Sequence, residues 1–396
     1  MPDKQSIARR VPKGVLLLGF VSLLTDMSSQ MVFPLLPLFL ALELGADKWM
    51  IGLIRGFAEF TSSVLKPFSG KISDKIGKRK GIIFIGYALA AMVKPAFSLA
   101  KNWIHVLGMR ISERVGKGIR VAPRDALVSE LAVEGHTALA YGVQRSLDAA
   151  GKVSGALLLF LLFSVMGLGF RKLFLIAGIP AAIAAILVLS VKEPEKKVHG
   201  EHEVERAHRL AGGVSAELKF FIAIAAIFSL GNYTQDFILL RGLNMGISIN
   251  GVIFSNVVFF SLIVVTAQVA GDIADKIGRL PLIFVAFLCF IVTTVVLMMA
   301  SDLLYYLVAF AIFGIFYGIW DSIPRAFVAD IAGEKKGLSF GLYHMAVGLS
   351  MLPGVMIAGY LWDLFGPRAT FLYALTLSTT ALIMLLAYYS FIFKKR

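Results

Sequence analysis

The sequence contains few charged residues and almost no cysteine. Asp, Glu, Lys and Arg make up 16% of its 396 residues, whereas they make up roughly 25% of an ordinary soluble domain. Hydrophobic residues make up 58% of the chain. This composition excludes a soluble globular enzyme and a disordered protein. The one cysteine, Cys289, has no second thiol within the chain with which to form a disulfide.

The sequence also lacks the motifs that would indicate an ATP-driven pump or a metalloenzyme. It has no Gly-x-x-x-x-Gly-Lys-Ser/Thr loop for nucleotide phosphates, no His-Glu-x-x-His motif and no cysteine–histidine cluster with the spacing of metal ligands. We therefore expect no enzymatic activity, no cofactor and no metal. The net charge of +14 is better explained by the basic cytoplasmic loops of a membrane protein than by nucleic-acid binding.

Twelve apolar runs occupy most of the chain. A helix that spans a bilayer needs about 20 mostly apolar residues, and the runs do not show the alternation that is typical of transmembrane β-strands. We therefore predict an all-α integral membrane protein with twelve transmembrane helices. The runs lie near residues 15–41, 50–70, 81–100, 102–123, 137–165, 170–191, 217–241, 249–270, 280–300, 303–329, 337–362 and 369–393.

Lysine and arginine are distributed unevenly among the loops. They are concentrated in the N-terminal segment, in the loop after the second run and at the end of the chain, whereas the intervening loops contain few. Because cytoplasmic loops are enriched in these residues, both termini are predicted to be cytoplasmic. The expected location is the inner (cytoplasmic) membrane of the cell.

The longest polar stretch separates the sixth run from the seventh. It covers residues 192–216 and divides the twelve runs into two sets of six. We predict an N-terminal six-helix bundle at 1–191, a cytoplasmic linker at 192–216 and a C-terminal six-helix bundle at 217–396.

An internal repeat indicates that the two bundles are pseudo-symmetric. The segments Gly70–Arg79 and Gly271–Leu280 follow the second and eighth runs and are identical at six of ten positions. At the same offset of 201 residues, Pro123 and Arg124 correspond to Pro324 and Arg325. A duplicated six-helix unit keeps the same orientation in the membrane, and the substrate is expected near the midplane where the halves face each other.

The repeated loop also has a mechanical interpretation. Gly70 would allow close approach of a neighbouring helix, Gly77 would permit a tight turn, and Asp74 would face a helix N-terminus. Such a loop would act as a latch that holds the halves together on the cytoplasmic side in one conformation. The predicted gating residues are Gly70, Asp74, Gly77, Arg79, Gly271, Asp275 and Gly278.

These motifs resemble those of a known family. The segment Gly70–Arg79 resembles the signature loop of the major facilitator superfamily, and Gly271–Arg279 resembles its second copy. Arg114, Lys117 and Gly118 resemble the superfamily's Arg-x-x-Gln-Gly motif, with Lys117 where glutamine is usual. The resemblance implies alternating access of two six-helix halves, usually coupled to a proton or sodium gradient.

One position departs from the pattern of the superfamily's drug/proton antiporters. These antiporters tend to have a Gly-Pro motif in the fifth span, where this chain has Gly151-Lys152-Val153-Ser154-Gly155. Lys152 therefore stands in the place of the proline.

Ionisable side chains are unusually frequent in runs one to five. They are costly at bilayer depth, and we treat them as functional candidates. At helical spacing, Arg110, Arg114, Lys117 and Arg124 share one face, which should point toward the protein interior or a water-filled cavity. The nine cations and four anions are Asp26, Arg55, Glu59, Lys66, Lys94, Arg110, Glu113, Arg114, Lys117, Arg120, Arg145, Asp148 and Lys152.

Three interpretations of these charges remain open. The first is a structural network, in which the pairs Arg55–Glu59, Glu113–Lys117 and Asp148–Lys152 lie four residues apart on their helices. The second is an anion site, because the nine cations outnumber the four anions. A third interpretation, proton coupling through carboxylates, is compatible with either.

The favoured hypothesis is a proton-coupled secondary transporter for a small organic anion or an anionic amphiphile. The alternatives are a broad-specificity drug/proton antiporter and, from another class, a membrane receptor or enzyme. The expected partners are a small-molecule substrate, the lipid bilayer and protons, and the protein is expected to be a monomer. The candidate substrate-binding residues are Arg110, Arg114, Lys117, Arg55, Lys152 and Asp236, and the candidate proton-coupling residues are Asp26, Glu59, Glu113 and Asp148.

Overall fold

The described part of the chain is built from helices. The computed structural model describes residues 11–133, 137–193, 215–332 and 336–395. Within these ranges there is no β-strand, which confirms the all-α prediction. Most of the predicted linker, residues 194–214, lies outside the described residues.

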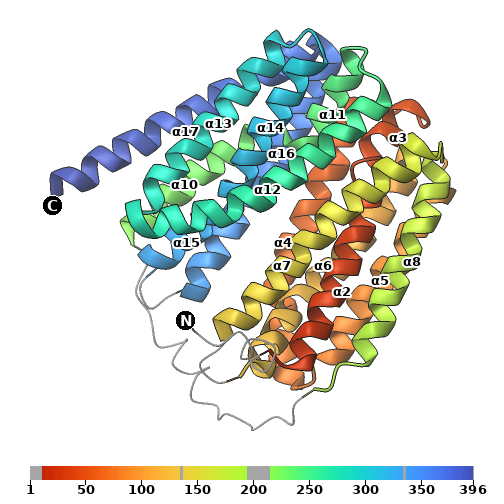
Figure 1. Cartoon of the computed structure of the whole chain (residues 1–396). Helices are drawn as coiled ribbons and strands as arrows, with labels where there is room; N and C mark the ends of the chain where they lie inside the picture. Colours follow the sequence, from red (N-terminus) through yellow and green to blue (C-terminus); the bar gives the residue numbers. More distant parts are fainter. Residues whose placement is uncertain (1–10, 134–136, 194–214, 333–335, 396) are drawn as a thin grey trace, which may run out of the picture. The chain divides into compact units, whose positions relative to one another are not determined.

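The first six spans correspond closely to the apolar runs (Figure 1). The first span is broken at residues 33–35, where Pro34 lies between two helices. A short 3₁₀ turn, Phe97–Leu99, extends the third span, and a π-helical turn, Leu161–Val165, extends the fifth. The helices are α2 (Lys13–Val32), α3 (Leu36–Leu42), α4 (Lys48–Ile76), α5 (Lys80–Ala96), α6 (Trp103–Leu131), α7 (Thr137–Phe160) and α8 (Phe170–Leu189).

The last six spans also follow the apolar runs. The seventh is broken at residues 231–233 and the tenth at residues 321–322, so that each consists of two helices. The helices are α10 (Ala216–Leu230), α11 (Thr234–Asn244), α12 (Ile249–Ile277), α13 (Arg279–Met299), α14 (Leu303–Trp320), α15 (Ile323–Ile331), α16 (Lys336–Phe365) and α17 (Pro367–Lys395).

Ten of the twelve spans are long and apolar enough to cross a membrane by length and composition. The other two are α4 and α6, in which seven and eight residues are Asp, Glu, Lys or Arg. Together they make the twelve transmembrane helices predicted from the sequence. The two helices that fall short on hydropathy are therefore the ones that carry most of the candidate site.

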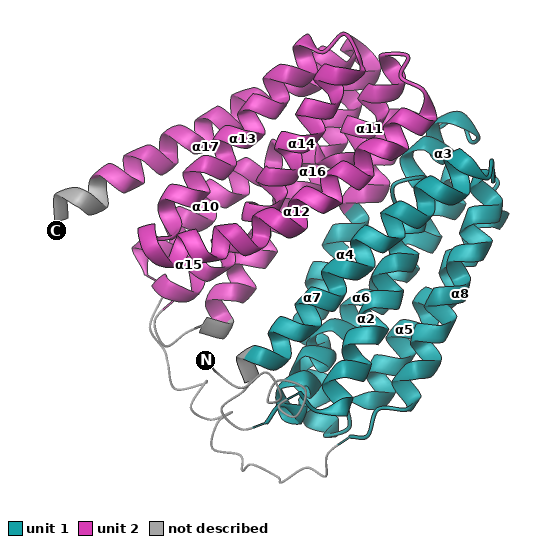
Figure 2. Ribbon diagram, viewed as in Figure 1, with its two compact units in different colours: residues 1–46, 57–195 teal, residues 47–56, 196–396 magenta. Residues whose placement is uncertain are grey.

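The chain divides into two compact units (Figure 2). Unit 1 comprises residues 1–46 and 57–195, and unit 2 comprises residues 47–56 and 196–396. The first turns of α4 thus cluster with unit 2 and the rest of this helix with unit 1. The boundary proposed at residues 192–216 stays a prediction.

Close helix contacts in unit 1 depend on glycine. Helix α2 packs against α7 and α8, and α5 packs against α6 and α8. A Cβ atom at Gly151 or Gly155 of α7 would lie 2.4 Å from the carbonyl oxygen of Leu23 or Met27 in α2. Only glycine allows the two backbones to approach this closely, as in other membrane helix pairs.

An aromatic core fills unit 2. The ring of Phe228 in α10 stacks on Phe287 of α13 with centroids 4.2 Å apart, and Trp320 of α14 lies against both rings. The first turn of α4 packs on α16, where Asp363 accepts hydrogen bonds from the backbone N–H groups of Lys48 (3.1 Å) and Trp49 (2.9 Å). These contacts fix α4, which carries two of the candidate site residues.

Candidate functional site

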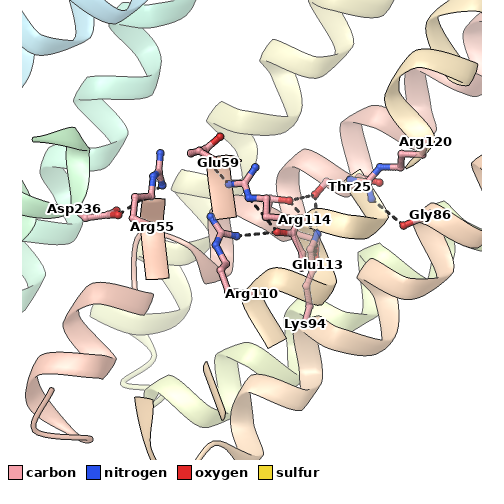
Figure 3. A network of polar contacts seen from close by, with 12 residues as sticks. Thr25, Arg55, Glu59, Gly86, Lys94, Arg110, Glu113, Arg114, Arg120 and Asp236 are labelled. Atoms are coloured by element: carbon pink, nitrogen blue, oxygen red, sulfur yellow. Dashed lines mark hydrogen bonds and ion pairs between the residues drawn. The ribbon is translucent and has the colours of Figure 1, made fainter. Parts of the chain in front are cut away.

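A buried charge network lies at the centre of unit 1 (Figure 3). We use this name for Glu59 of α4 and for Arg110, Glu113 and Arg114 of α6. Oε2 of Glu113 lies 2.9 Å from Nη1 of Arg110 and 3.4 Å from Nε of Arg114. Nη2 of Arg114 lies 3.1 Å from Oε1 of Glu59. Two cations and two anions give the network a formal charge of zero.

The side chains of this network differ in exposure. Arg110, Glu113 and Arg114 are 3%, 2% and 6% exposed, whereas Glu59 is 26% exposed. Glu59 is therefore the member through which solvent or a solute reaches the network most directly.

The sequence of α6 explains why the network forms here. The Asn102 side chain caps the helix by accepting a hydrogen bond from the backbone N–H of His105 (3.0 Å). Residues 110, 113 and 114 then fall on one face. A Cβ atom at Gly116 would lie 2.7 Å from the Gly86 carbonyl oxygen, and one at Gly118 would lie 2.6 Å from Cβ of Leu65. The glycines draw α4 and α5 close enough for side chains of α6 to reach them.

An aromatic ring completes the surroundings of Arg110. Phe33 lies in the break between α2 and α3, and the Arg110 guanidinium carbon is 3.6 Å from its ring centroid. The Arg114 guanidinium is farther, at 5.6 Å. A cation over a ring face is stabilised by the ring's quadrupole, so the break in the first span contributes to holding Arg110 in place.

Two further buried cations of unit 1 bind neutral oxygen atoms. Nζ of Lys94 donates hydrogen bonds of 3.0 Å to the Thr25 carbonyl and to the hydroxyls of Ser28 and Ser29. Nη1 of Arg120 donates to the Gly86 carbonyl (2.9 Å), and its guanidinium lies over the Tyr87 ring. Among the described residues, neither cation forms an ion pair within 4.0 Å.

The face of α6 that was predicted to point inward does so. Arg110 and Arg114 are buried, and Lys117 and Arg124 are half-buried. Arg124 contacts Asp125 (2.8 Å) and donates to the Ser22 hydroxyl (3.0 Å).

Two of the ion pairs that were predicted within single helices do not form. Glu113 contacts Arg110 and Arg114 rather than Lys117, because both guanidinium groups reach the same carboxylate. Asp148 lies 3.9 Å from Arg145 and is not paired with Lys152 within 4.0 Å among the described residues.

The remaining coupling candidates lie on α2 and α7. Asp148 is 11% exposed and its Oδ1 atom has no hydrogen-bond partner among the described residues. Asp26 and Lys152 are close enough to interact with it electrostatically. Lys117 in turn lies within electrostatic reach of Arg114, Glu59 and Lys66.

Arg55 and Asp236 form a separate ion pair in unit 2, with Nη1 and Oδ2 3.7 Å apart. Asp236 is in the first turn of α11, just after the break in the seventh span. Thr234 at the start of α11 has a left-handed backbone (φ 59°), and its N–H donates to the Asn232 side chain (2.9 Å). The structure therefore assigns these two candidates to a different unit from Arg110, Arg114 and Lys117.

The predicted latch is built around Arg79. Its Nη2 atom lies 2.9 Å from Asp74 and 2.8 Å from Glu130, and Nη1 donates to the Ser73 hydroxyl (2.9 Å). Burial alone would lower the pKa of Arg79, but the hydrogen bonds and charges of Glu130 and Asp74 raise it above its ordinary value. The loop is thus fixed by a charged cluster rather than by its turn alone.

Two details of the latch differ from the prediction. The backbone N–H of Arg79, at the start of α5, donates to Glu193, which is not among the predicted gating residues. A Cβ atom at Gly70 would be 3.4 Å from Ala122, an ordinary contact, and one at Gly271 would meet no described atom within 4 Å. Close helix approach therefore does not require these two glycines. Gly77 does need its flexibility, because its φ is +75°.

The second copy of the loop has a related geometry. Arg279 contacts Asp275 (2.6 Å) and Asp330 (3.5 Å), and Gly278 has a φ of +90°. The arginine follows the turn glycine directly here, whereas Arg79 comes two residues after Gly77. The two copies of the repeat thus share one arrangement, in which an arginine lies between two carboxylates.

Sequence reasoning missed three contributors. Glu130 and Glu193 hold the Arg79 loop, and Asp363 caps α4 from 315 residues away. No local pattern in the sequence indicates any of these contacts, since they depend on which helices are neighbours.

Comparison with known proteins agrees with the arrangement of helices and loops. The family model of the Major Facilitator Superfamily matches residues 18–352 and 220–392. The chain therefore belongs to the Major Facilitator Superfamily, and it is a membrane transporter rather than an enzyme.

Individual relatives cover nearly the whole chain. An uncharacterised transporter of the same superfamily from Methanocaldococcus jannaschii is 32% identical over 388 residues, which are 96% of this chain and 95% of the relative. The quinolone resistance protein NorA of Staphylococcus aureus is 23% identical over 369 residues. The aligned region covers 89% of this chain and 90% of the NorA chain. A crystal structure of a peptide transporter in complex with sulfate has a TM-score of 0.77 at 13% identity, with 100% of this chain and 99% of that chain covered. The last likeness concerns the fold alone.

Proposed function

We propose that this transporter moves a small organic anion, or an amphiphile with an anionic head, together with protons by alternating access. The observation that carries the proposal is the Glu59–Arg114 pair. It joins a partly exposed carboxylate to a buried guanidinium at 3.1 Å. The exposed partner is the one that a proton or a solute reaches first.

Charge balance then links the proton to the anion. With Glu59 ionised, the charge network is neutral. Protonation of Glu59 leaves the network with a charge of +1, and an anion at Arg114 restores neutrality. Because an uncompensated buried charge is costly, proton and anion should bind together. Both then cross the membrane in the same direction.

The chemistry of the neighbouring side chains suits an anion. A guanidinium presents paired N–H donors to a carboxylate, sulfonate or phosphate. Lys117 lies within electrostatic reach of Arg114 and Glu59 and would add a second positive charge. We propose Arg110, Arg114 and Lys117 as the primary binding residues.

The other candidates keep secondary roles in the proposal. Three of them are proposed to contact the substrate during part of the cycle: Lys152 and the paired residues Arg55 and Asp236. Asp26, Glu113 and Asp148 are further proton-coupling candidates beside Glu59.

The two charged loops are proposed to act as gates. Asp74 and Arg79, together with Gly77, would hold one closed state, and Asp275 and Gly278 would do the same in the second unit. Breaking an ion pair and re-forming it elsewhere is a common way for packed helices to switch between two states. We further propose that both termini are cytoplasmic, that the protein resides in the inner membrane and that it acts as a monomer.

Drug/proton antiport is the second candidate function. It is supported by the similarity to the Staphylococcus aureus quinolone resistance protein. In that case the buried arginines would be structural and apolar walls would bind the drug. A cationic drug competes with the proton for the same carboxylate, so the two would move in opposite directions.

Flux into proteoliposomes separates these candidates. The test substrates are labelled benzenesulfonate, decanesulfonate and glycerol 3-phosphate as anions and ethidium as a cationic drug. Sulfonates are chosen because they do not cross lipid as neutral acids. An anion/proton symporter accumulates an anion when the lumen is alkaline. A drug/proton antiporter accumulates ethidium when the lumen is acidic.

The controls are protein-free liposomes and a Glu43→Gln variant, in which an exposed carboxylate paired with Arg171 is removed. Anion uptake driven only by an alkaline lumen supports the proposal. Ethidium uptake driven only by an acidic lumen favours the second candidate. An absence of flux for all four solutes under both gradients contradicts both.

A further inference from the structure

Lys94 is fully buried (Figure 3), and no carboxylate of the described residues lies within 4.0 Å of its Nζ atom. It lies on α5, one residue before Pro95, and its Nζ atom reaches α2. The three oxygen atoms around Nζ belong to Thr25, Ser28 and Ser29, each at 3.0 Å. All three are electrically neutral.

The three contacts of Nζ match the hydrogen-bonding capacity of the charged form of this amine. The Ser28 hydroxyl donates its proton to the Ala177 carbonyl of α8, and the Ser29 hydroxyl donates to the Thr25 carbonyl (2.8 Å). A hydroxyl has only one proton to donate. In this arrangement both serines accept from Lys94, as the Thr25 carbonyl does. The three acceptors match the three N–H donors of the charged ammonium.

The charges around Lys94 cancel without it. The charged groups that act most strongly on Lys94 are Glu113, Arg110 and Arg120 of α6 and Asp26 of α2. Two carboxylates and two guanidinium groups sum to zero. The ammonium of Lys94 therefore adds a positive charge that nothing in this cluster compensates.

We propose that Lys94 is a proton-binding site of the transport cycle and that its contacts in this structure are those of its protonated form. An uncompensated buried charge is removed either by binding an anion nearby or by losing a proton. Lys94 keeps its proton while an anion is bound in unit 1 and releases it when the anion has left. This proposal rests on the proposed anion/proton symport.

The step is balanced in atoms and charge. On release, an N–H bond of the ammonium breaks, the proton goes to water on the side where the anion leaves, and a neutral amine remains. No group is oxidised or reduced. The amine has two N–H donors instead of three, so one hydrogen bond to α2 is lost. The contact between α5 and α2 therefore weakens in the empty state, which couples the proton to a movement of these helices.

The test compares accumulation with exchange in proteoliposomes, using labelled benzenesulfonate as the probe. The membrane potential is clamped at zero and the lumen is made alkaline by one pH unit. Each coupled proton then multiplies the limiting accumulation ratio by about tenfold. Lys94→Arg keeps a charged donor at this position but does not release its proton. It should lower the ratio by about tenfold and leave equilibrium exchange of benzenesulfonate within about threefold.

Lys94→Gln, which has no proton to release, should show the same loss of accumulation. The matched control is Lys172→Arg, at an exposed lysine of α8, and its accumulation should equal that of the wild type. Wild-type accumulation in Lys94→Arg would overturn the proposal. Equal loss of exchange and accumulation in a folded Lys94 variant would also overturn it, because Lys94 would then only support the structure.

A second measurement is independent of transport. Lys94→Ala removes three carbons and the nitrogen, which propylammonium replaces. The thermal midpoint of purified Lys94→Ala should rise on adding propylammonium and not on adding propanol. Equal rescue by propanol would refute the ammonium site. If the wild type accumulates no probe, the proposed function fails together with the coupling step, and the rescue result still decides whether the ammonium site exists.

Discussion

Glu113→Gln tests whether the charge network stabilises unit 1 through its one shared carboxylate. Glu113 is 2% exposed and lies 2.9 Å from Arg110 and 3.4 Å from Arg114. The substitution keeps the size of the side chain and changes the network's charge from zero to +1. Removing one partner of a buried ion pair costs about 3–5 kcal/mol. We expect the free energy of unfolding to fall by an amount in this range.

The exposed pair Arg171–Glu43 provides the matched control. Its atoms are 3.2 Å apart, similar to those of the network, but its side chains are 44% and 35% exposed. An exposed pair contributes about 0–1 kcal/mol. Glu43→Gln should therefore change the free energy of unfolding much less than Glu113→Gln, although each variant removes one carboxylate that contacts an arginine.

The assay is unfolding of the purified protein, followed both thermally and in a denaturing detergent. A double-mutant cycle with Arg110→Gln isolates the interaction free energy between Arg110 and Glu113. Because Arg110 and Glu113 are in contact, the double variant should be less destabilised than the sum of the single variants by about 1–3 kcal/mol. A loss for Glu113→Gln of no more than about 0.5 kcal/mol, or strict additivity, would refute the reasoning.

Two further predictions concern the helices that frame the site. Gly359→Ala in α16 places a Cβ atom 2.4 Å from the Lys48 carbonyl oxygen of α4. It should displace the start of α4 and lower the thermal midpoint. Gly341→Ala on the same helix, with no described atom within 4 Å, should have no effect, and equal midpoints for the two variants would contradict this packing. Asp74→Ala removes a 2.9 Å contact with Arg79 and should slow benzenesulfonate exchange while leaving its half-saturation concentration unchanged. A wild-type rate would exclude a gating role for this contact.

The spans could be predicted well because each is a long apolar run. Even so, length and apolar composition indicate only ten of them and omit α4 and α6. The buried charges of α6 are tolerated because they are paired, as Arg110 and Arg114 are with Glu113. A run of apolar residues indicates a span, but it does not indicate where the span breaks. Pro34 marks the break after α2, whereas residues 231–233 carry no proline.

The partners of the charged residues could be predicted only in part. Some pairs do follow residue spacing: Asp321 and Arg325, four residues apart, are in contact (3.0 Å). Spacing failed for Glu113 because a second arginine, rather than Lys117, reaches the same carboxylate. Glu59 pairs with Arg114 on another helix, and no spacing rule covers such a contact. Sequence patterns thus indicate which charged residues fall within the spans, and packing decides what each of them contacts.

The most direct test of the central claim is the number of protons that the purified protein takes up when an anion binds. A pH indicator in weakly buffered detergent solution reports this number during titration with benzenesulfonate. The account predicts uptake of protons, since the bound anion favours protonated Glu59 and charged Lys94. Release of protons, or saturable binding with no change in proton occupancy, would contradict it.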